Sequence, residues 1–483
     1  MIKSLEIPRK DVLRRMADDN PWWVAGGGID PEWRTWKRRA YFTPFMRLTG
    51  DLSVPRAVVL IGPRRVGKTV MVKHAIHSLL ELGTRGVDIL YLSIETPLYS
   101  GRSLESLLLD FMDVHGHQRE RRLWVFFDEV QYLRDWEVHL KSLVDSYRNV
   151  RFVVSGSAAA ALKMKSRESG AGRFTDFMLP PLTFAEYLDF ANTEEALIEV
   201  VDSEPGKPPR YHAPNIMELN REFVNYLNFG GFPEAVMSPA VRENPTRFLR
   251  QDIVDKVLLK DLPSLFGIQD TQELNRFFNV LAYNTGEEVS PESLSKHAGI
   301  RKEKLAEYLE YLEAAFLVRR VHRLDASARR LQRARTFKVY LTNPSIRAAL
   351  FGYVRADDEA LGKLAETALW SQWLHSTSMM HSLHYARWKQ GSTDLEVDLV
   401  SLDPRTQKPR LAVEIKWTDS AFDNWSELRG IREFASKHLL QRNPLVTTLT
   451  KHGTGKDGDL TIDFVPTSLH CYTVARNLLR SSV

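Results

Sequence analysis

Apolar runs of strand length alternate with amphipathic segments along the first third of the chain. AVVLI at residues 57–61 precedes a loop bounded by glycines, and MVKHAIHSLLE after the loop places its apolar residues at helical spacing. LWVFF at 123–127 and RFVVS at 151–155 are further runs of this kind. Short apolar runs separated by helical patterns are typical of parallel strands that are covered on both faces. The pattern therefore predicts an α/β fold for this part of the chain.

Two further patterns follow in the rest of the chain. Ser290, Pro291 and Gly299 stand where an N-cap, a first helical residue and a turn are needed, and they predict a helix-turn-helix. Its second helix is expected to bury one face, which consists of Leu305, Tyr308, Leu309, Leu312 and Phe316. Towards the end, the strand-like runs LEVDLV and LAVEIK lie between two helical segments, and PLVTTLT follows. This order predicts a second α/β unit.

Length and composition limit the class of protein. The chain has 483 residues, 43% of them apolar and 26% charged, which is enough for roughly three domains of ordinary size. The first twenty residues are charged throughout, and no apolar run is long enough to span a bilayer, so we expect a cytoplasmic protein with no membrane partner. Cys471 is the single cysteine, which excludes a disulfide framework and a cysteine-based zinc site.

The clearest chemical motif is G-x-x-x-x-G-K-T, which lies between the first predicted strand and its helix. Gly62 and Gly67 let backbone amides turn towards phosphates, Lys68 reaches the β- and γ-phosphates, and the Thr69 hydroxyl can bind magnesium. The motif therefore predicts a site for ATP and Mg²⁺. The predicted nucleotide-binding residues are Gly62, Pro63, Arg64, Arg65, Val66, Gly67, Lys68, Thr69, Val70, Asp128 and Ser155.

Acidic residues follow directly on the apolar run LWVFF. Asp128 is expected to hold the magnesium ion together with Thr69, and Glu129 is expected to polarise the attacking water. Ser155 or Ser157, at the end of the next strand, can sense the γ-phosphate; alternatively, these serines only form a turn. An acid pair in this place predicts that the protein is an ATPase.

The order of these motifs resembles the AAA+ and STAND-like ATPases, and in particular a bacterial and archaeal group usually described only as uncharacterised ATP-binding proteins. The segments ESGAGRFTDFMLPPLTFAEYL and FGGFPEAV add to the resemblance, whereas residues 1–34 have no clear counterpart. The resemblance implies a homo-oligomeric ring, of which a hexamer is one form. In such a ring Arg173 would reach the γ-phosphate of a neighbouring subunit, and Arg250 is the alternative.

The helix-turn-helix is followed by a strand, which suggests a winged helix. Its second helix exposes Glu303, Glu307 and Glu310, which would repel phosphates, so we do not expect it to read bases in the major groove. The stretch from Arg319 to Lys338 is rich in arginine and contains one acid. It is either a solvated loop or the contact to the DNA backbone.

The strands LEVDLV and LAVEIK carry charged residues where burial makes charges costly. Strand alternation places Glu414 and Lys416 on one face, where Asp398 can join them. Carboxylates in this arrangement bind magnesium, and the lysine stabilises the attacking hydroxide or the phosphate charge. The set resembles the PD-(D/E)xK nucleases of restriction-endonuclease-like fold, although Val397 precedes Asp398 in place of proline. Glu366 matches the helical acid of the archaeal Holliday-junction-resolvase type and would be a further metal ligand.

Two states of the C-terminal site stay open: an active metal-dependent endonuclease, or an inactive nuclease fold kept for binding DNA or protein. The leading hypothesis is an ATP-hydrolysing DNA motor or remodeller that acts on branched or broken double-stranded DNA. The alternatives are a STAND-like nucleotide-gated regulator or defence switch, and a protein-remodelling ATPase. The expected parts are an N-terminal extension at 1–34, a P-loop ATPase core at 35–190, a helical lid or connector at 191–270, a winged helix at 271–348 and a nuclease-like domain at 349–483.

Overall fold

The computed structural model describes residues 7–156, 172–202, 208–329 and 336–481. It divides into two compact units, an N-terminal unit that ends at Leu179 and a C-terminal unit that begins at Pro180. The boundary expected at residue 190 lies inside the C-terminal unit. Ser157, one of the two expected phosphate sensors, lies outside the described residues.

In the described part of the N-terminal unit, five parallel strands form one sheet in the order β2-β3-β4-β1-β5. The strands are β1 (Ala57–Ile61), β2 (Ile89–Ser93), β3 (Leu123–Asp128), β4 (Val150–Gly156) and β5 (Phe174–Met178). β1, β3 and β4 are buried along their whole length, as expected for parallel strands with helices on both faces. The predicted α/β fold with a parallel sheet is confirmed.

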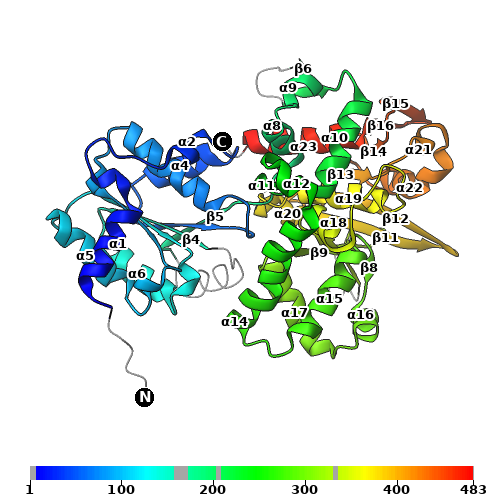
Figure 1. Cartoon of the computed structure of the whole chain (residues 1–483). Coiled ribbons are helices and arrows are strands. Elements are labelled where there is room, and N and C mark those ends of the chain that lie inside the picture. The colour runs from blue at the N-terminus through cyan, green and yellow to red at the C-terminus, as the bar shows by residue number, and fades with distance from the viewer. Residues whose placement is uncertain (1–6, 157–171, 203–207, 330–335, 482–483) are drawn as a thin grey trace. The chain divides into compact units, whose positions relative to one another are not determined.

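Helices lie on both sides of this sheet, with α2 and α4 on one side and α5 and α6 on the other (Figure 1). The α-helices of the unit are α1 (Arg9–Asp19), α2 (Pro31–Thr35), α3 (Phe42–Gly50), α4 (Lys68–Glu81), α5 (Leu104–His115) and α6 (Trp136–Ser146). Short 3-10 turns η1 to η4 comprise Pro21–Trp23, Gly86–Asp88, Pro97–Tyr99 and Val130–Tyr132.

The segment before residue 35 covers the outer edge of strand β2. Asn20 accepts a hydrogen bond from the Tyr91 amide at 2.6 Å and donates one to the Tyr91 carbonyl at 2.8 Å. The indole N–H groups of Trp22 and Trp23 donate to the carbonyl oxygen of Ile89. An uncovered edge strand offers its free backbone groups to other chains. The N-terminal segment therefore satisfies backbone groups at this edge of the sheet with its side chains.

In the C-terminal unit, nine strands among the described residues form one mixed sheet in the order β15-β16-β14-β13-β12-β11-β9-β10-β8. The strands are β8 (Glu288–Val289), β9 (Val318–Leu324), β10 (Phe337–Leu341), β11 (Leu383–Gln390), β12 (Thr393–Leu402), β13 (Pro409–Glu414), β14 (Leu445–Thr448), β15 (Gly453–Asp457) and β16 (Leu460–Pro466). A two-stranded sheet consists of β6 (Glu199–Asp202) and β7 (Arg210–His212).

The large sheet joins the strands of the expected winged helix to those of the expected nuclease-like domain. The junction is the parallel pairing of β9 with β11, which covers two residue pairs, Tyr385 with Arg323 and Ala386 with Leu324. The strands β8 to β10 are thus part of the same sheet as β11 to β16.

The described residues of the C-terminal unit also form helices, which fall into two groups along the chain. The first group contains α8 (Phe184–Phe190), α9 (Glu194–Leu197), α10 (Ile216–Phe229), α11 (Pro233–Met237), α12 (Pro239–Glu243), α13 (Pro245–Leu249), α14 (Leu262–Phe266) and α15 (Thr271–Tyr283). The second contains α16 (Pro291–Ala298), α17 (Lys302–Ala314), α18 (Ser345–Phe351), α19 (Leu361–Ser371), α20 (Thr377–Ser382), α21 (Ser420–Asp423), α22 (Arg429–Lys437) and α23 (Thr467–Ser481). Two π-helical segments, η5 and η6, comprise Arg250–Asp255 and Val257–Asp261, and the 3-10 segment η7 comprises Trp425–Leu428.

The predicted helix-turn-helix elements are present as α16 and α17. Ser290 caps α16 by accepting a hydrogen bond from the Ser293 amide, and Gly299 ends it with a φ of 69°. Helix α17 ends at Ala314, so Phe316, which was expected in its buried face, lies beyond the helix with a φ of 56°. That part of the helix prediction is wrong, because the chain turns there to enter β9.

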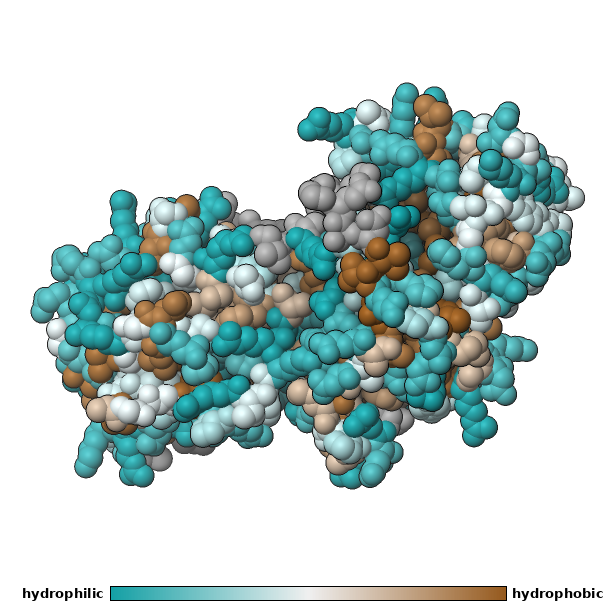
Figure 2. Space-filling view, turned by 90° about the horizontal axis from the view of Figure 1, so that it is seen from above, coloured by the Kyte–Doolittle hydropathy of each residue, from teal (hydrophilic) through white to brown (hydrophobic). Residues whose placement is uncertain are grey.

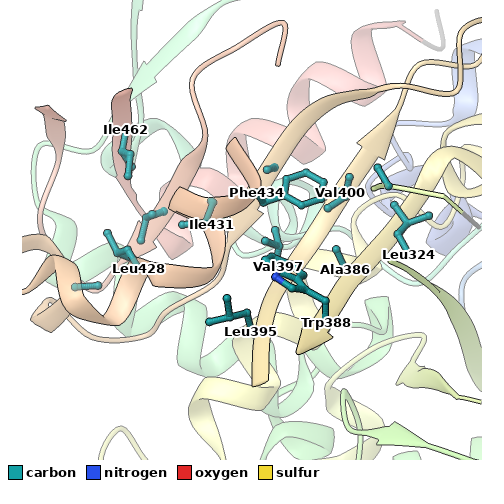
Figure 3. Packing of buried hydrophobic residues seen from close by; sticks show 14 of the residues in the cluster. Leu324, Ala386, Trp388, Leu395, Val397, Val400, Leu428, Ile431, Phe434 and Ile462 are labelled. Atoms are coloured by element: carbon teal, nitrogen blue, oxygen red, sulfur yellow. The ribbon is translucent and has the colours of Figure 1, made fainter. Parts of the chain in front are cut away.

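Strand β12 shows why its charged residues lie together. Leu395 and Val397 enter a hydrophobic cluster with Ile431 and Phe434 of helix α22 (Figure 3). Successive side chains of a strand point to opposite faces, so the residues between and after these two lie on the other face of the sheet. The apolar alternation on one face therefore determines where the acidic residues of the other face gather.

The face of the molecule in Figure 2 is mostly hydrophilic, with hydrophobic residues in small separate groups. Over the described residues, we find no helix that combines the length and the apolar character needed to cross a membrane.

Asn20→Ala tests the role of the N-terminal segment, because it removes both hydrogen bonds to the backbone of Tyr91. We expect the free energy of unfolding to fall by about 2–4 kcal/mol, since each buried polar group left unsatisfied costs about 1–3 kcal/mol. Urea denaturation followed by tryptophan fluorescence measures the change.

Asn149→Ala is the matched control, because its side chain makes one exposed hydrogen bond, to the carbonyl oxygen of Glu120. It should change the free energy of unfolding by less than about 0.5 kcal/mol. Equal losses in the two variants would contradict the covering role of Asn20.

Candidate functional site

The loop between β1 and α4 needs glycine at both ends. A Cβ atom on Gly62 would lie 2.1 Å from the carbonyl oxygen of Leu179, so only glycine permits this approach of the two backbones. Gly67 is the N-cap of α4 and has a φ of 92°, which is also a conformation that favours glycine. The loop therefore delivers the chain into the N-terminus of a helix of 14 residues, where unpaired amides and the helix dipole favour an anion.

Lys68 is buried at the start of α4. Its ammonium group donates to the carbonyl oxygens of Gly62 at 3.0 Å and Pro63 at 2.7 Å, both in the loop. Arg39, which the sequence analysis did not identify, is also buried and donates to the carbonyl oxygen of Val66 at 2.6 Å. Two cationic side chains thus contact the backbone of the loop.

Asp128 lies at the end of β3 and accepts hydrogen bonds from several groups. Thr69 donates to it at 2.7 Å and Tyr91 at 3.1 Å, and the Ser155 hydroxyl donates to its other oxygen. The sheet order explains this set, since β4 lies between β1 and β3 and brings Ser155 beside Asp128. The structure thus brings together three of the predicted residues and adds Tyr91, for which the sequence offered no signal.

The donor set around Asp128 fits a magnesium ion. The Thr69 hydroxyl and the Asp128 carboxylate are neighbouring oxygen ligands of the kind that Mg²⁺ prefers. The Thr69 hydroxyl donates a hydrogen bond to Oδ2 of Asp128, so the two oxygen atoms are direct neighbours. Residues that hold this ion would be Thr69 and Asp128.

Glu129 follows Asp128 with a φ of 55°, in the left-handed region. For a residue with a side chain this conformation costs energy and is often found at functional sites. Gln131 donates a hydrogen bond from its side-chain amide to the Glu129 carboxylate and so holds its direction. Gln131 was not identified from the sequence.

Arg173 precedes β5 and forms an ion pair with Asp145 of helix α6 at 2.7 Å. Its carbonyl accepts a hydrogen bond from the amide of Ala57, the first residue of β1. Because β1 runs from Ala57 towards the phosphate loop, Arg173 lies at the opposite end of this strand. Its expected action on another subunit stays a prediction, as does that of Arg250, which lies 4.0 Å from Asp255.

A second candidate site lies in the C-terminal unit, between β12 and β13. Lys416 forms an ion pair with Glu414 at 2.8 Å, and Asp398 accepts a hydrogen bond from the amide of Ile415 at 2.8 Å. The antiparallel pairing of Leu399 with Val413 brings the two strands into this register. Three of the residues predicted for the nuclease-like site therefore lie together.

Lys338 of strand β10 joins this group and was missed as a site residue. It is 2% exposed, and its ammonium group lies 2.8 Å from Glu366, 2.6 Å from Glu396 and 3.7 Å from Asp398. The expectation that the stretch ending at Lys338 contacts DNA from the surface is wrong for this residue, because it is buried. The signal was available, since Lys338 interrupts the apolar strand FKVYL, where a charge needs a partner.

Other arginines of that stretch also contact residues within the unit. Arg320 pairs with Glu313 of helix α17, and Arg323 donates to the carbonyl oxygen of Arg387 at 2.9 Å. Residues 330–335 lie outside the described residues. The arginine-rich stretch is thus in part a set of internal contacts.

Charge is unevenly distributed in this cluster. Burial, and then the charge of Asp398, raises the pKa of Glu414 to about 8, although Lys416 is beside it. Burial and the charge of Glu366 raise the pKa of Asp398 to about 6. Burial also opposes ionisation of Glu366, yet the charges of Lys338 and Lys363 and its hydrogen bonds outweigh burial and lower its pKa. The neighbouring lysines therefore do not fully offset the burial of Asp398 and Glu414.

The expected three-carboxylate metal site is not assembled. Among the residues that the structure describes, no three His, Cys, Asp or Glu side chains are grouped to hold a metal ion. The physical reason is that Glu366 is engaged by Lys338 and by the Tyr340 hydroxyl, which donates to it at 2.5 Å. Asp398 and Glu414 remain as a pair, and Oε2 of Glu414 is buried with no hydrogen-bond partner in the described residues. This orphaned oxygen fits a cation ligand.

Two family models match separate segments of the chain. Residues 54–188 match the family model of the AAA domain, and residues 220–357 match a domain of unknown function (DUF8612). The first segment contains the phosphate loop, Asp128, Glu129, Ser155 and Arg173. Together with the geometry of the loop, this match supports a P-loop ATPase domain of the AAA type in the N-terminal unit.

Relatives of the chain are themselves described only as uncharacterized. A protein of Haemophilus influenzae is 26% identical over 276 residues, which are 55% of this chain and 62% of the relative, so the match spans less than two thirds of that protein. A protein of Methanocaldococcus jannaschii is 24% identical over 362 residues, 73% of this chain and 74% of the relative.

Solved structures with a likeness to the chain include a Walker-type ATPase of Pyrococcus abyssi and the replication initiator DnaA bound to AMPPCP and single-stranded DNA. The first has a TM-score of 0.42 at 15% identity, and the match covers 68% of this chain and 99% of the chain of the Pyrococcus protein. The second has a TM-score of 0.28 at 11% identity, and the match covers 59% of this chain and 92% of the DnaA chain. Both TM-scores lie below 0.5 and establish no common fold.

The raised pKa of Glu414 predicts a dependence of stability on pH. The folded chain keeps this proton up to about pH 8, whereas the ordinary pKa of a glutamate is 4.5. Between these values the folded chain binds more protons than the unfolded chain, so the free energy of unfolding should fall as the pH rises. Glu414→Gln should flatten this fall, as measured by urea denaturation from pH 4.5 to 8.5 in buffer with EDTA.

Glu359→Gln, at an exposed glutamate of the same unit, is the matched control and should keep the slope of the wild type. If Glu414→Gln also keeps that slope, Glu414 is ionised in the folded chain, and burial does not raise its pKa as inferred.

Proposed function

We propose that the chain is an AAA-type ATPase that binds ATP with Mg²⁺ and hydrolyses it. The observation that carries this proposal is that Thr69 and Ser155 both donate hydrogen bonds to the carboxylate of Asp128, beside the phosphate loop. Magnesium, when bound, would neutralise phosphate charge and would be held by Thr69 and Asp128. The residues of the chain bind and orient the nucleotide: the amides at the start of α4 and Lys68 hold the phosphates.

In this proposal Glu129 is the general base. Its carboxylate lies one residue beyond Asp128, is directed by Gln131, and accepts the proton of the water that attacks the γ-phosphate. The bond between this phosphate and the β-phosphate oxygen breaks, and ADP and phosphate leave. Arg173 acts on the nucleotide of a neighbouring subunit, where it stabilises the charge of the transition state. This role requires a homo-oligomer and requires Arg173 to leave Asp145.

We further propose that the ATPase acts on DNA, branched or double-stranded, through the C-terminal unit. The resemblance of Asp398, Glu414 and Lys416 to the PD-(D/E)xK set supports this, as does the proximity of the three residues. In an active endonuclease the two carboxylates would hold a divalent ion, which supplies a hydroxide nucleophile when bound. Lys416 would stabilise the negative charge that develops on the cleaved phosphate.

The second candidate is an ATPase whose C-terminal unit is a binding module, in a nucleotide-gated switch or in a protein remodeller. One observation favours it: Lys338 forms ion pairs with both Glu366 and Glu396, so that these carboxylates already have a cationic partner within the chain. Paired carboxylates of this kind stabilise a fold without any reaction. The two candidates differ in whether the wild-type protein cuts DNA.

Lys68→Ala and Glu129→Gln test the ATPase proposal. Lys68→Ala should lose nucleotide binding, because it removes the phosphate-binding cation, whereas Glu129→Gln should bind ATP normally and hydrolyse it at least about 100-fold more slowly. Binding is measured with a fluorescent ATP analogue and hydrolysis by phosphate release, each with and without linear, single-stranded and four-way junction DNA.

Glu120→Gln, at an exposed glutamate of the same unit, is the control and should behave as the wild type. Wild-type hydrolysis by Glu129→Gln would refute the general-base role. DNA should raise the rate of the wild type; stimulation by a protein client in place of DNA would favour the second candidate.

Asp398→Ala and Lys416→Ala test the endonuclease proposal. With Mg²⁺ or Mn²⁺ the wild type should cut linear, flapped or junction DNA, and both variants should lose this activity while ATP hydrolysis survives, because the two sites lie in different units. Lys416→Ala should still bind DNA, since it lacks only the stabilisation of developing charge. Gel analysis of labelled DNA measures cleavage.

Asp394→Ala is the matched control on the same strand, because Asp394 is exposed and lies outside the cluster. It should cut DNA as the wild type does. A wild type that cuts no DNA with either metal would leave the C-terminal unit as a binding module.

A further inference from the structure

The carboxylate group of the C-terminal unit contains two halves with different partners. In one half Lys338 contacts Glu366 and Glu396 at 2.8 and 2.6 Å. In the other half Lys416 contacts one oxygen of Glu414, whose second oxygen is buried and has no partner in the described residues. Asp398 lies between the halves, 3.7 Å from Lys338. Each half thus contains one lysine, and the carboxylate oxygen without a partner belongs to the half that contains Lys416.

Lys338 is enclosed on several sides. Its ammonium group lies 5.4 Å from the ring centre of Tyr385 and 6.0 Å from that of Tyr340, distances at which aromatic faces attract a cation. Gly286 packs against Glu366 so closely that an added Cβ would lie 3.5 Å from its carboxylate and 3.2 Å from the Tyr340 ring. A cation in this position is therefore surrounded by oxygen and aromatic groups.

The contact of Lys338 with β12 depends on the curvature of the sheet. In the strand order, β9 and β11 lie between β10, which carries Lys338, and β12, which carries Glu396 and Asp398. Flat strands spaced about 4.8 Å apart would keep them too far apart for a lysine side chain to bridge. The pairing of β9 with β11 covers only two residue pairs, so we infer that the sheet curves between β10 and β12. The ammonium group is thus brought to the carboxylates by the junction of the two halves of the sheet.

From this geometry we propose that Lys338 is a built-in cation that takes the place of one divalent metal ion, so that the cluster binds a single divalent ion, at Asp398 and Glu414. The ammonium nitrogen lies 2.8 and 2.6 Å from oxygens of Glu366 and Glu396, within charge-assisted hydrogen bonds, so its positive charge stands where the carboxylates would otherwise need a metal ion. The inference rests on the proposed metal site of the C-terminal unit and is independent of DNA cleavage.

Lys338→Met tests the proposal, because methionine keeps the length of the side chain and removes its charge. The probe is Mn²⁺ without nucleotide, and the number of bound ions is measured by calorimetry and by the electron paramagnetic resonance signal of free Mn²⁺. We expect Lys338→Met to bind one ion more than the wild type, since Glu366, Glu396 and Asp398 then lack their cation. Lys338→Met/Glu396→Gln should lose this additional ion, and Glu414→Gln alone should bind one ion fewer than the wild type.

Thermal denaturation gives a second measurement, which also works if Lys338→Met is less stable than the wild type. Without metal this variant should melt at a lower temperature than the wild type, and Mn²⁺ should restore it by binding the folded state. The same Mn²⁺ concentration should restore Lys338→Met/Glu396→Gln much less.

The outcomes separate the two proposals. If the wild type and Glu414→Gln bind the same number of ions, the proposed metal site at Asp398 and Glu414 is wrong. If that site is present but Lys338→Met binds no additional ion and is not restored by Mn²⁺, Lys338 does not stand in for a metal ion. An additional ion that persists in Lys338→Met/Glu396→Gln would also overturn the proposal.

Discussion

Both units of this protein depend on the same constraint, that a carboxylate removed from water must be given hydrogen bonds or charge. In the N-terminal unit Asp128 is buried and accepts hydrogen bonds from Thr69, Tyr91 and Ser155. In the C-terminal unit Lys338 meets the same need for Glu366 and Glu396. In each candidate site, hydrogen bonds or ion pairs therefore also connect segments that lie far apart in the sequence.

The two sites differ in how completely this need is met. Asp128 has a donor on each oxygen, and the N-terminal segment supports one of them, because Asn20 holds the backbone of Tyr91. For Asp398 and Glu414 the neighbouring lysines do not fully offset burial, and Oε2 of Glu414 has no partner in the described part of the chain. Incomplete compensation raises the pKa of both carboxyls and is typical of functional sites. The C-terminal site is thus the one whose chemistry depends most on what it binds.

The sheet of the C-terminal unit connects the strands next to the helix-turn-helix with those of the carboxylate cluster. Strand β8 precedes the helix-turn-helix and β9 and β10 follow it. All three belong to the same sheet as β12 and β13, which carry Asp398 and Glu414, and β9 joins that part of the sheet by pairing with β11. Arg320 and Arg323, which a free wing would offer to DNA, contact Glu313 and the backbone of Arg387. Lys338 thus belongs to a strand next to the helix-turn-helix and at the same time to the carboxylate cluster of β12.

The sequence by itself determined the elements whose signals are local. The strand, glycine loop and helix around Lys68 follow from neighbouring residues, and so does the acid pair at the end of β3. The alternation in LAVEIK likewise predicted that Glu414 and Lys416 share a face, and the two residues form an ion pair at 2.8 Å. The tertiary structure alone decided which groups meet across the chain: Asn20 with Tyr91, Ser155 with Asp128, and Lys338 with Glu366. Such contacts depend on strand order and on the bend of a sheet, which arise from packing between segments many residues apart and leave no local pattern.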